Sequence, residues 1–442
     1  CGVLLAAYKV HVRHIDFTDI DKPNIVLITI DTVRADHLGL YGYDRNTSPA
    51  ISGLSRKGVV FKHAISQSPW TLPSIASIHT SKYPPKHGAI KADTAIKDGL
   101  ETIAETLKKE GYYNIGIISA HFCGKKYGLA KGFDVFDESQ SLSHDAITSK
   151  ALTEIALDNL ENAPDKPFFL WVHYFDPHYS YVRHPEFGFA SFYKGSLPCT
   201  LDKKALKNRL NAGQLTDEDL EYIKAVYDEE IAYTDFWVGR LLDEINNRGM
   251  AGSTITIVTA DHGEYFLERG RFFHGKDVYE ELVHVPLVIS GAINKEYHGS
   301  VVNQSVEISS IAKTIMELVK VEDHGYDGEN LLTFAHKTNK PQFVFSYGCY
   351  AWGQDERKTM AVYDKWKLIR NLDDDSYELY NLNVDKKEEN DLWQDASGET
   401  AAKRKIMKQK LDEFASKKID ITAAVEIDKN SLKRLESLGY VQ

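Results

Sequence analysis

Two short apolar runs of the sequence end in side chains that can bind a divalent metal ion. Pro23 to Leu40 reads PNIVLITIDTVRADHLGL, in which the apolar run stops at Asp31, and Ser253 to Gly263 reads STITIVTADHG, which ends with Asp261 and His262. Such β-branched runs are typical of strands buried on both faces of a parallel sheet. If the two strands are neighbours, we expect Asp31, Asp261 and His262 to bind one cation where the strands end. The alternative for Asp31 is an ordinary turn residue, because Asp-Thr is also favourable in turns.

Thr71 is the candidate nucleophile. It lies two residues before Pro73 in the sequence SPWTLPSIASIHT, and proline there suits the first turn of a helix. Free N–H groups and the positive end of the helix dipole would draw an anion to the Thr71 hydroxyl, which could then attack a phosphoryl or sulfuryl group. The alternative is a helix N-cap, which threonine often provides, and the local pattern by itself favours the cap.

Two histidines are candidates for contact with a substrate anion or for proton transfer. His178 follows a third apolar run, Phe168 to His173, in the sequence FDPH, and His274 lies in a loop of sequence HGK before a short predicted helix. Imidazole is the usual proton donor at neutral pH. A single histidine at such a place is often a core residue, but three strand ends that each carry Asp or His make a shared site the better interpretation.

Composition and charge limit the class of protein. The chain has 442 residues, of which 43% are hydrophobic and 26% charged, so it predicts a globular protein with one large α/β domain and a smaller appendage. The net charge of −11 disfavours binding of nucleic acid, because phosphates would be repelled on average. The four cysteines are scattered and do not determine the redox compartment.

The first residues suggest export. Cys1 is followed by GVLLAAY, an apolar run far too short to span a bilayer. Either the chain was cut within a signal or membrane segment, or Cys1 is a lipid-modified terminus, or the boundary is arbitrary. We expect an exported protein, periplasmic or otherwise extracytoplasmic, for which membrane attachment through the N-terminus is one possibility.

The pattern along the chain predicts three parts: a lead-in over 1–22, a catalytic domain over 23–335 and a C-terminal antiparallel α+β subdomain over 336–442. Strands and helices alternate in the second part, where residues 202 to 248 are helical in pattern. Short strands separated by polar turns follow from Phe343, and a charged helix is expected over 398–417.

Several long motifs in the same order are together specific for one family. The quoted stretches are PNIVLITIDTVRADHLGLYGY, SPWTLPSIASIHTSKYPPKHGA, YFDPHYSY, TADHGEYFLERG, HGKDVYEELVHVPL, YDKWKLIRNLDDDSYELYNLNVDKKEENDL and LESLGY. On these motifs the chain resembles the sulfatase family of the alkaline phosphatase superfamily from about Pro23 to its end. The resemblance implies an α/β sandwich with a large, mixed, mostly parallel sheet, and a smaller C-terminal antiparallel sheet with a helix.

The resemblance also implies roles for individual residues. It implies one divalent metal ion (manganese, magnesium, zinc or calcium) bound by Asp31, Asp261 and His262. Thr71 falls at the position of the family's nucleophile. His178 and His274 resemble the positions that contact the substrate and the leaving group.

Three positions depart from the family pattern. Sulfatases carry Cys or Ser in a Cys/Ser-x-Pro-x-Arg motif and oxidise it to formylglycine, whereas this chain has Thr71 and has Ile75 in place of the arginine. Thr32 stands where a second aspartate usually follows the first. Fewer anionic ligands favour manganese, magnesium or zinc over calcium. The arrangement looks more like that of the threonine-nucleophile relatives, the phosphoethanolamine transferases and lipoteichoic-acid synthases.

The leading hypothesis is a metal-dependent hydrolase or transferase that acts on a phosphate or sulfate ester through Thr71. Its substrate would be an anionic ester, with a lipid headgroup or a sugar among the candidates. A first alternative is a sulfatase that works without formylglycine. A second is a catalytically inactive, sulfatase-like binding protein, which the missing arginine and aspartate suggest.

Overall fold

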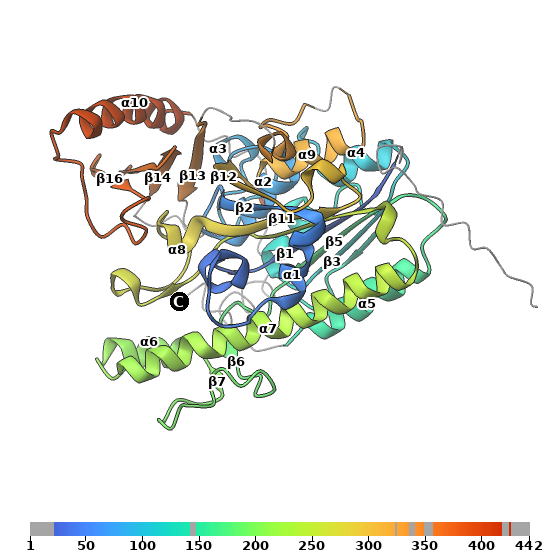
Figure 1. Ribbon diagram of the computed structural model, residues 1–442, viewed down its shortest axis with the longest axis horizontal. Helices are drawn as coiled ribbons and strands as arrows, with labels where there is room; N and C mark the ends of the chain where they lie inside the picture. The colour runs from blue at the N-terminus through green and yellow to red at the C-terminus, as the bar shows by residue number, and fades with distance from the viewer. Residues whose placement is uncertain are drawn as a thin grey trace, which may run out of the picture.

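The computed structural model describes residues 22–141, 147–322, 325–335, 341–348, 357–417 and 424–425. Its centre is an eight-stranded sheet between two layers of helices (Figure 1). The strands lie in the order β12-β2-β11-β8-β1-β5-β3-β4, and β11 is antiparallel to both of its neighbours whereas the other pairs are parallel. The expected large, mixed, mostly parallel sheet is therefore confirmed. Its strands are β1 (Asn24–Ile30), β2 (Gly58–Ile65), β3 (Tyr113–Ile118), β4 (Val135–Asp137), β5 (Phe168–Tyr174), β8 (Thr254–Ala260), β11 (His284–Gly291) and β12 (Ser300–Glu307).

Helices cover both faces of this sheet. One layer contains the long helix α7 and its neighbours α1 and α5, and the opposite layer contains α2, α3, α4 and α9 (Figure 1). Because both faces are covered, the central strands are buried along their whole length, which explains why they are apolar without alternation. The helices of the two layers are α1 (Pro49–Leu54), α2 (Thr71–Thr80), α3 (Pro84–His87), α4 (Ile103–Lys109), α5 (Ser149–Glu161), α7 (Asp217–Asn247) and α9 (Ser310–Leu318).

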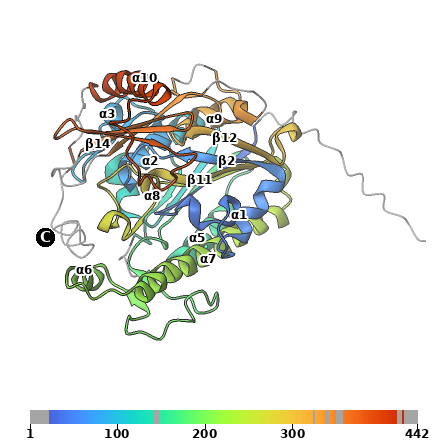
Figure 2. The same cartoon turned by 60° about the vertical axis from the view of Figure 1, so that its left-hand side comes forward.

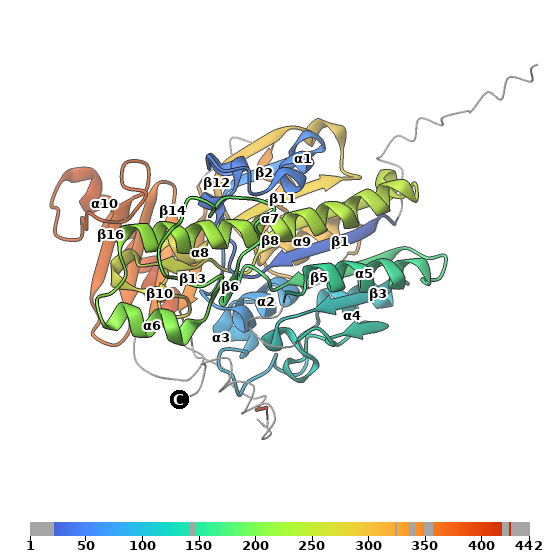
Figure 3. The same cartoon turned by 90° about the horizontal axis from the view of Figure 1, so that it is seen from below.

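Shorter elements lie near the carboxyl ends of the central strands. Two small antiparallel pairs are formed by β6 (Tyr181–Val182) with β7 (Thr200–Leu201) and by β9 (Tyr265–Phe266) with β10 (Phe272–Phe273). The remaining helices here are α6 (Lys203–Asn211) and α8 (Glu280–Val283), and α6 lies at the same end of the molecule as β10 (Figure 3).

The helical region expected over residues 202 to 248 is divided into α6 and α7. The break contains Gly213, which has a positive φ of 62°, and Thr216, which caps α7. The Thr216 side chain accepts a hydrogen bond from the Asp219 N–H, and the Asp219 carboxylate accepts from the Thr216 N–H, so a capping box starts the second helix. The region is therefore helical as expected, in two helices, because the capping box marks a second helix start.

A four-stranded antiparallel sheet with one helix follows the main sheet, as expected. It consists of β13 (Phe343–Gly348), β14 (Lys358–Tyr363), β15 (Trp366–Asn371), β16 (Tyr377–Asn381) and α10 (Gly398–Ala415). Figure 2 shows α10 above this sheet. The sheet also packs against the segment between β9 and α8 through a small apolar cluster that includes Val278, Leu282, Met360 and Ile369. The first residue of the predicted C-terminal subdomain, 336, and all but the last residue of the predicted lead-in over 1–22 lie outside the described residues.

Within the described part of the chain, no helix combines the length and the apolar character needed to cross a membrane. The N-terminal attachment considered above concerns residues outside that part.

An ionic cluster joins the small sheet to the main domain. The Lys367 side chain is fully buried, and its Nζ lies 2.8 Å from Glu280 Oε1 and 2.9 Å from Glu388 Oε1. Glu388 Oε2 also accepts a hydrogen bond from the Glu280 N–H at 2.7 Å. Removing one partner of such a buried ionic cluster is costly, because the charges that remain lose their counter-charge.

We predict that Lys367→Met lowers the free energy of unfolding by about 3 kcal/mol, because it leaves two buried carboxylates without their cation. The loss should be larger at pH 8 than at pH 6, since protonation relieves the repulsion. Urea denaturation followed by circular dichroism measures both effects. Lys365→Met is the matched control: its Nζ pairs with Glu399 at 3.2 Å on the surface, so its cost should stay below about 1 kcal/mol. Equal losses in the two variants would contradict the prediction.

Candidate active site

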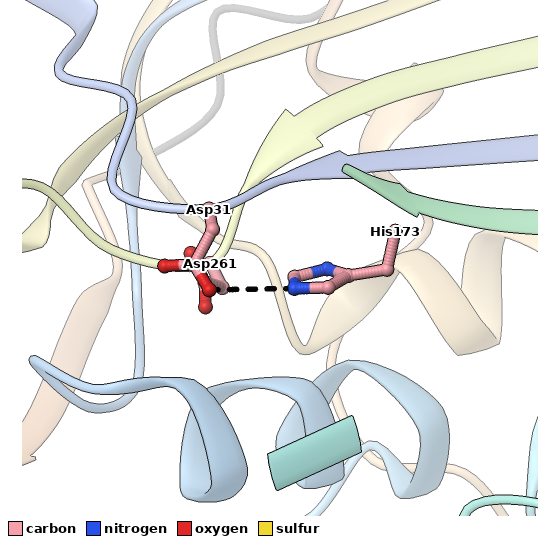
Figure 4. A group of neighbouring side chains, drawn as sticks. All are labelled: Asp31, His173 and Asp261. Atoms are coloured by element: carbon pink, nitrogen blue, oxygen red, sulfur yellow. Dashed lines mark ion pairs between the residues drawn. The ribbon is translucent and has the colours of Figure 1, made fainter. Parts of the chain in front are cut away.

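The register of three central strands brings Asp31, His173 and Asp261 together (Figure 4). In the pairing of β1 with β8, Ile30 lies opposite Ala260, so the residues that follow, Asp31 and Asp261, leave the sheet side by side. In the pairing of β1 with β5, Thr29 lies opposite His173. Side chains two residues apart on a strand share a face, so His173 points to the same side as Asp31. One ligand atom from each of the three side chains lies within 4.8 Å of the others.

The three side chains suit a divalent cation. All are fully buried, and neither Asp31 oxygen, nor Asp261 Oδ2, nor His173 Nε2 has a hydrogen-bond partner in the described part of the chain. Burial raises the pKa of Asp31 to about 7, against the opposing effects of His262 and the Thr71 hydroxyl. Burial and the neighbouring Asp31 raise the pKa of Asp261 to about 6. Oxygen and imidazole ligands that lack other partners are what such an ion requires.

His173 is the site residue that sequence reasoning did not select. It lies within the carboxyl-terminal part of an apolar strand, where a histidine looks like a core residue. In the structure its Nδ1 lies 2.8 Å from Thr29 Oγ1, and its Nε2 lies 3.5 Å from Asp31 Oδ2. Burial lowers the pKa of His173 to about 4, which favours the neutral ring that a metal ligand needs.

His262 lies against the same two carboxylates. Its Nε2 is 3.6 Å from Asp31 Oδ1 and 3.4 Å from Asp261 Oδ2, and its Nδ1 lies 2.9 Å from the Gly263 carbonyl oxygen. A bond to that carbonyl requires a proton on Nδ1, which leaves Nε2 as the atom that faces the carboxylates. The structure therefore brings all three residues of the predicted ligand set together and adds His173 to them.

Thr71 lies next to this cluster. Its Oγ1 is 3.4 Å from His262 Nε2, and the residue is only 3% exposed. The N-cap position of α2 is taken by Trp70 without a side-chain capping bond, and Thr71 is the first helical residue. The N-cap interpretation that the local pattern favoured was therefore wrong, because the Thr71 hydroxyl is directed to the carboxylate and histidine groups instead of to the helix backbone.

The start of α2 is tied to the end of β8. The Ser74 hydroxyl donates to the Asp261 carbonyl oxygen at 2.6 Å and lies 2.9 Å from the Ser66 hydroxyl. This places the amino end of a ten-residue helix beside the cluster, where its unbonded N–H groups favour an anion.

The turn after β1 has a strained backbone at Thr32, and this turn places an N–H beside Asp261. Thr32 has a φ of 57°, which is rare for a β-branched residue. Its N–H donates to Asp261 Oδ1 at 3.2 Å, and its carbonyl oxygen accepts from the Tyr227 hydroxyl at 2.7 Å. The strained turn thus places a backbone donor against the Asp261 carboxylate.

His274 is held by a buried carboxylate. Its Nδ1 lies 2.9 Å from Glu264 Oε1, and Glu264 Oε2 accepts a hydrogen bond from the Tyr181 hydroxyl at 3.0 Å. Burial raises the pKa of Glu264 well above its usual value. The centres of the His274 and His262 imidazole rings are 4.4 Å apart, so His274 lies beside the cluster.

His178 completes the neighbourhood. Its ring lies 4.9 Å from the His274 ring and is stacked on Phe175 at 4.4 Å. Its Nδ1 lies 2.6 Å from the Tyr179 carbonyl oxygen, and the residue is 1% exposed. His178 and His274 therefore form one group beside His262, whose Nε2 lies 3.4 Å from the Thr71 hydroxyl, and their catalytic roles stay a prediction.

Together these groups can stabilise and transfer a tetrahedral anion. A hydroxyl lies between a helix amino end and a set of cation ligands, and two histidines lie close enough to exchange protons with a leaving oxygen.

Two family models match most of the chain. The family model described as "Sulfatase" matches residues 23–321, and the model described as "N-sulphoglucosamine sulphohydrolase, C-terminal" matches residues 268–417. An arylsulfatase of Clostridium perfringens is 25% identical to this chain over 83% of the chain and 89% of its own length. An ulvan-active sulfatase of Formosa agariphila is 26% identical over 70% of this chain and 64% of its own length.

Solved structures share the fold. A protein solved in complex with its substrate D-glucosamine-2-N,6-O-disulfate has a TM-score of 0.72 at 20% identity, covering 90% of this chain and 98% of its own. The phosphonate monoester hydrolase of Agrobacterium radiobacter has a TM-score of 0.71 at 19% identity, covering 89% of this chain and 96% of its own. Since the first family model alone spans more than half of the sequence, the chain belongs to the sulfatase family, whose members are ester hydrolases of the alkaline phosphatase superfamily.

Proposed function

We propose that the protein is a metal-dependent enzyme that hydrolyses or transfers a phosphate or sulfate ester through Thr71. The observation that carries the proposal is the position of the Thr71 hydroxyl, 3.4 Å from His262 Nε2 at the amino end of α2 and beside the Asp31, His173 and Asp261 group. A structural N-cap would have no reason to face two buried carboxylates. The threonine-nucleophile relatives noted above support the same assignment.

Asp31, Asp261, His173 and His262 would hold the ion. When bound, a divalent cation would favour deprotonation of the nearby hydroxyl and neutralise charge on the transferred group. These residues come from three neighbouring strands. The register of the sheet would therefore hold their backbone positions fixed around the ion.

In the proposed reaction Thr71 Oγ1 forms a bond to the phosphorus or sulfur atom while the bond to the ester oxygen breaks. The unbonded N–H groups of the first turn of α2 face the equatorial oxygens of the transferred group. His274 gives a proton to the departing oxygen. Its Nδ1 lies 2.9 Å from Glu264 Oε1, which orients the ring, and the proton would pass from Nε2.

The covalent threonine ester is then cleaved by water or by an acceptor hydroxyl, which restores Thr71. The sulfated sugar bound by one neighbour of the same fold supports sugar esters as candidate substrates. The phosphonate monoester hydrolase among the neighbours supports phosphorus esters. Turnover of p-nitrophenyl sulfate compared with a phosphate monoester and a diester would establish which ester reacts.

Thr71→Ala should lower kcat/KM for the best of these esters by at least about 10³-fold, because it removes the nucleophile. Thr71→Ser keeps a hydroxyl and should retain a substantial part of the activity. Intact-protein mass spectrometry of quenched reactions should show the covalent adduct in the wild type and not in Thr71→Ala. Undiminished turnover by Thr71→Ala would refute the proposal.

Removal of metal should inactivate the enzyme and lower its melting temperature. Dialysis against a chelator, then readdition of manganese, magnesium, zinc or calcium, tests both effects, and elemental analysis identifies the native ion. Ion affinity should rise between pH 5 and pH 8, because the carboxyl groups with pKa values of about 7 and 6 must lose their protons to bind. Calorimetric titration of Asp31→Asn should show weakened binding, and wild-type affinity in this variant would contradict the assignment.

The role of His274 predicts a dependence on the leaving group. His274→Ala should slow the hydrolysis of an alkyl ester by about 10²-fold or more, since an alkoxide leaves only with a proton. It should affect the p-nitrophenyl ester much less, because nitrophenolate leaves without protonation. Equal losses for the two esters would argue for a purely structural role.

A further inference from the structure

The first residue of α6 reaches the group of aromatic rings beside His274. Lys203 Nζ donates to the Tyr179 hydroxyl at 2.7 Å and lies 4.1 Å from the centre of the Tyr179 ring. It is also 5.2 Å from the centre of the Phe273 ring. An ammonium group in contact with two aromatic faces is stabilised by their electron density while it is partly removed from water.

Those two rings adjoin the proposed proton donor. The Tyr179 ring is stacked on the His274 ring at 5.5 Å, and Phe273 directly precedes His274 on β10. The two aromatic rings are themselves 4.7 Å apart. The Lys203 ammonium is therefore linked to the ring of His274, the proposed proton donor, through one aromatic ring, that of Tyr179.

The helix that carries Lys203 is basic within an acidic protein. The sequence of α6, KKALKNRLN, contains three lysines and one arginine and no acidic residue, whereas the whole chain has a net charge of −11. Burial lowers the pKa of Lys203 to about 7, and the neighbouring Lys207 lowers it further while Glu264 opposes the change. An anion bound beside Lys203 would stabilise the charged form of the lysine against both burial and the repulsion from Lys207.

We propose that Lys203, held against Tyr179 and Phe273, binds a second anionic group of the substrate, on the leaving-group side of the site where His274 lies. This inference rests on the proposed function, which places the reacting ester at Thr71, and it narrows the substrate to esters whose non-reacting part carries a carboxylate or a further sulfate or phosphate. Lys203 would thus determine specificity without taking part in the chemical step.

Binding of unreactive ligand pairs tests this directly. Calorimetry on the metal-loaded enzyme compares benzenesulfonate with 4-sulfobenzoate, which adds a carboxylate across the ring, and repeats the comparison with phenylphosphonate and 4-phosphonobenzoate. The wild type should prefer the doubly charged ligand by about tenfold, the effect of one charge-assisted hydrogen bond. In Lys203→Met the preference should fall below about twofold, and Lys203→Arg should restore part of it.

Lys204→Met is the matched control, because it removes one positive charge from the same helix at an exposed neighbouring residue. It should keep most of the preference. Equal or undetectable binding of the two ligands by the wild type, or an undiminished preference in Lys203→Met, would overturn the inference.

Catalysis does not enter these measurements, so they separate this inference from the proposed function. Thr71→Ala should show the wild-type preference even when it no longer turns over an ester. If Thr71→Ala keeps full turnover, the nucleophile assignment fails while the binding data still decide the role of Lys203.

Discussion

The site depends on two buried carboxylates that the register of β1 and β8 forces together. Asp31 and Asp261 follow paired residues of adjacent strands and have no access to water. Two like charges in such a place cannot both be ionised cheaply, and the raised pKa values of both groups express that cost. A cation, or protons, must compensate. The imidazoles of His173 and His262 and the amino end of α2 lie around these two carboxylates.

The rest of the molecule holds these groups in place. The segment from β9 to α8 carries His274, and the small C-terminal sheet supports it through apolar packing and buried ion pairs. Asp277, three residues after His274, pairs with Arg271 and with Lys358 of β14, each at 2.7 Å. The described residues of the C-terminal subdomain thus contribute no side chain to the Asp31, His173 and Asp261 group, yet they support the loop that carries His274.

Membership of the sulfatase family settles the fold and the broad chemistry but not the nucleophile, because function resides in a few positions of a shared scaffold. At two positions where this chain departs from the family pattern, the structure shows the surroundings of the replacing residue. The Thr32 N–H donates to the Asp261 carboxylate. Ile75, which replaces the motif arginine, is fully buried in the core. Positive charge for binding the anion must therefore come from other groups. These are a cation held by the ligand cluster, the amino end of α2 and, by our proposal, Lys203.

The sequence by itself determined the strands, their sharp ends and the identity of most site residues. Apolar runs that stop at Asp31 and at Asp261-His262 are local patterns, and local patterns survive without knowledge of the fold. Residues whose local pattern is ambiguous could be assigned to the site only from the tertiary structure. His173 looks like a core histidine until β5 is placed beside β1, and Thr71 looks like an N-cap until α2 is placed against β8. The pairing of His274 with Glu264 and the contact of Lys203 with Tyr179 likewise join separate segments of the chain. Such contacts follow from strand order and packing, which short-range periodicity does not encode.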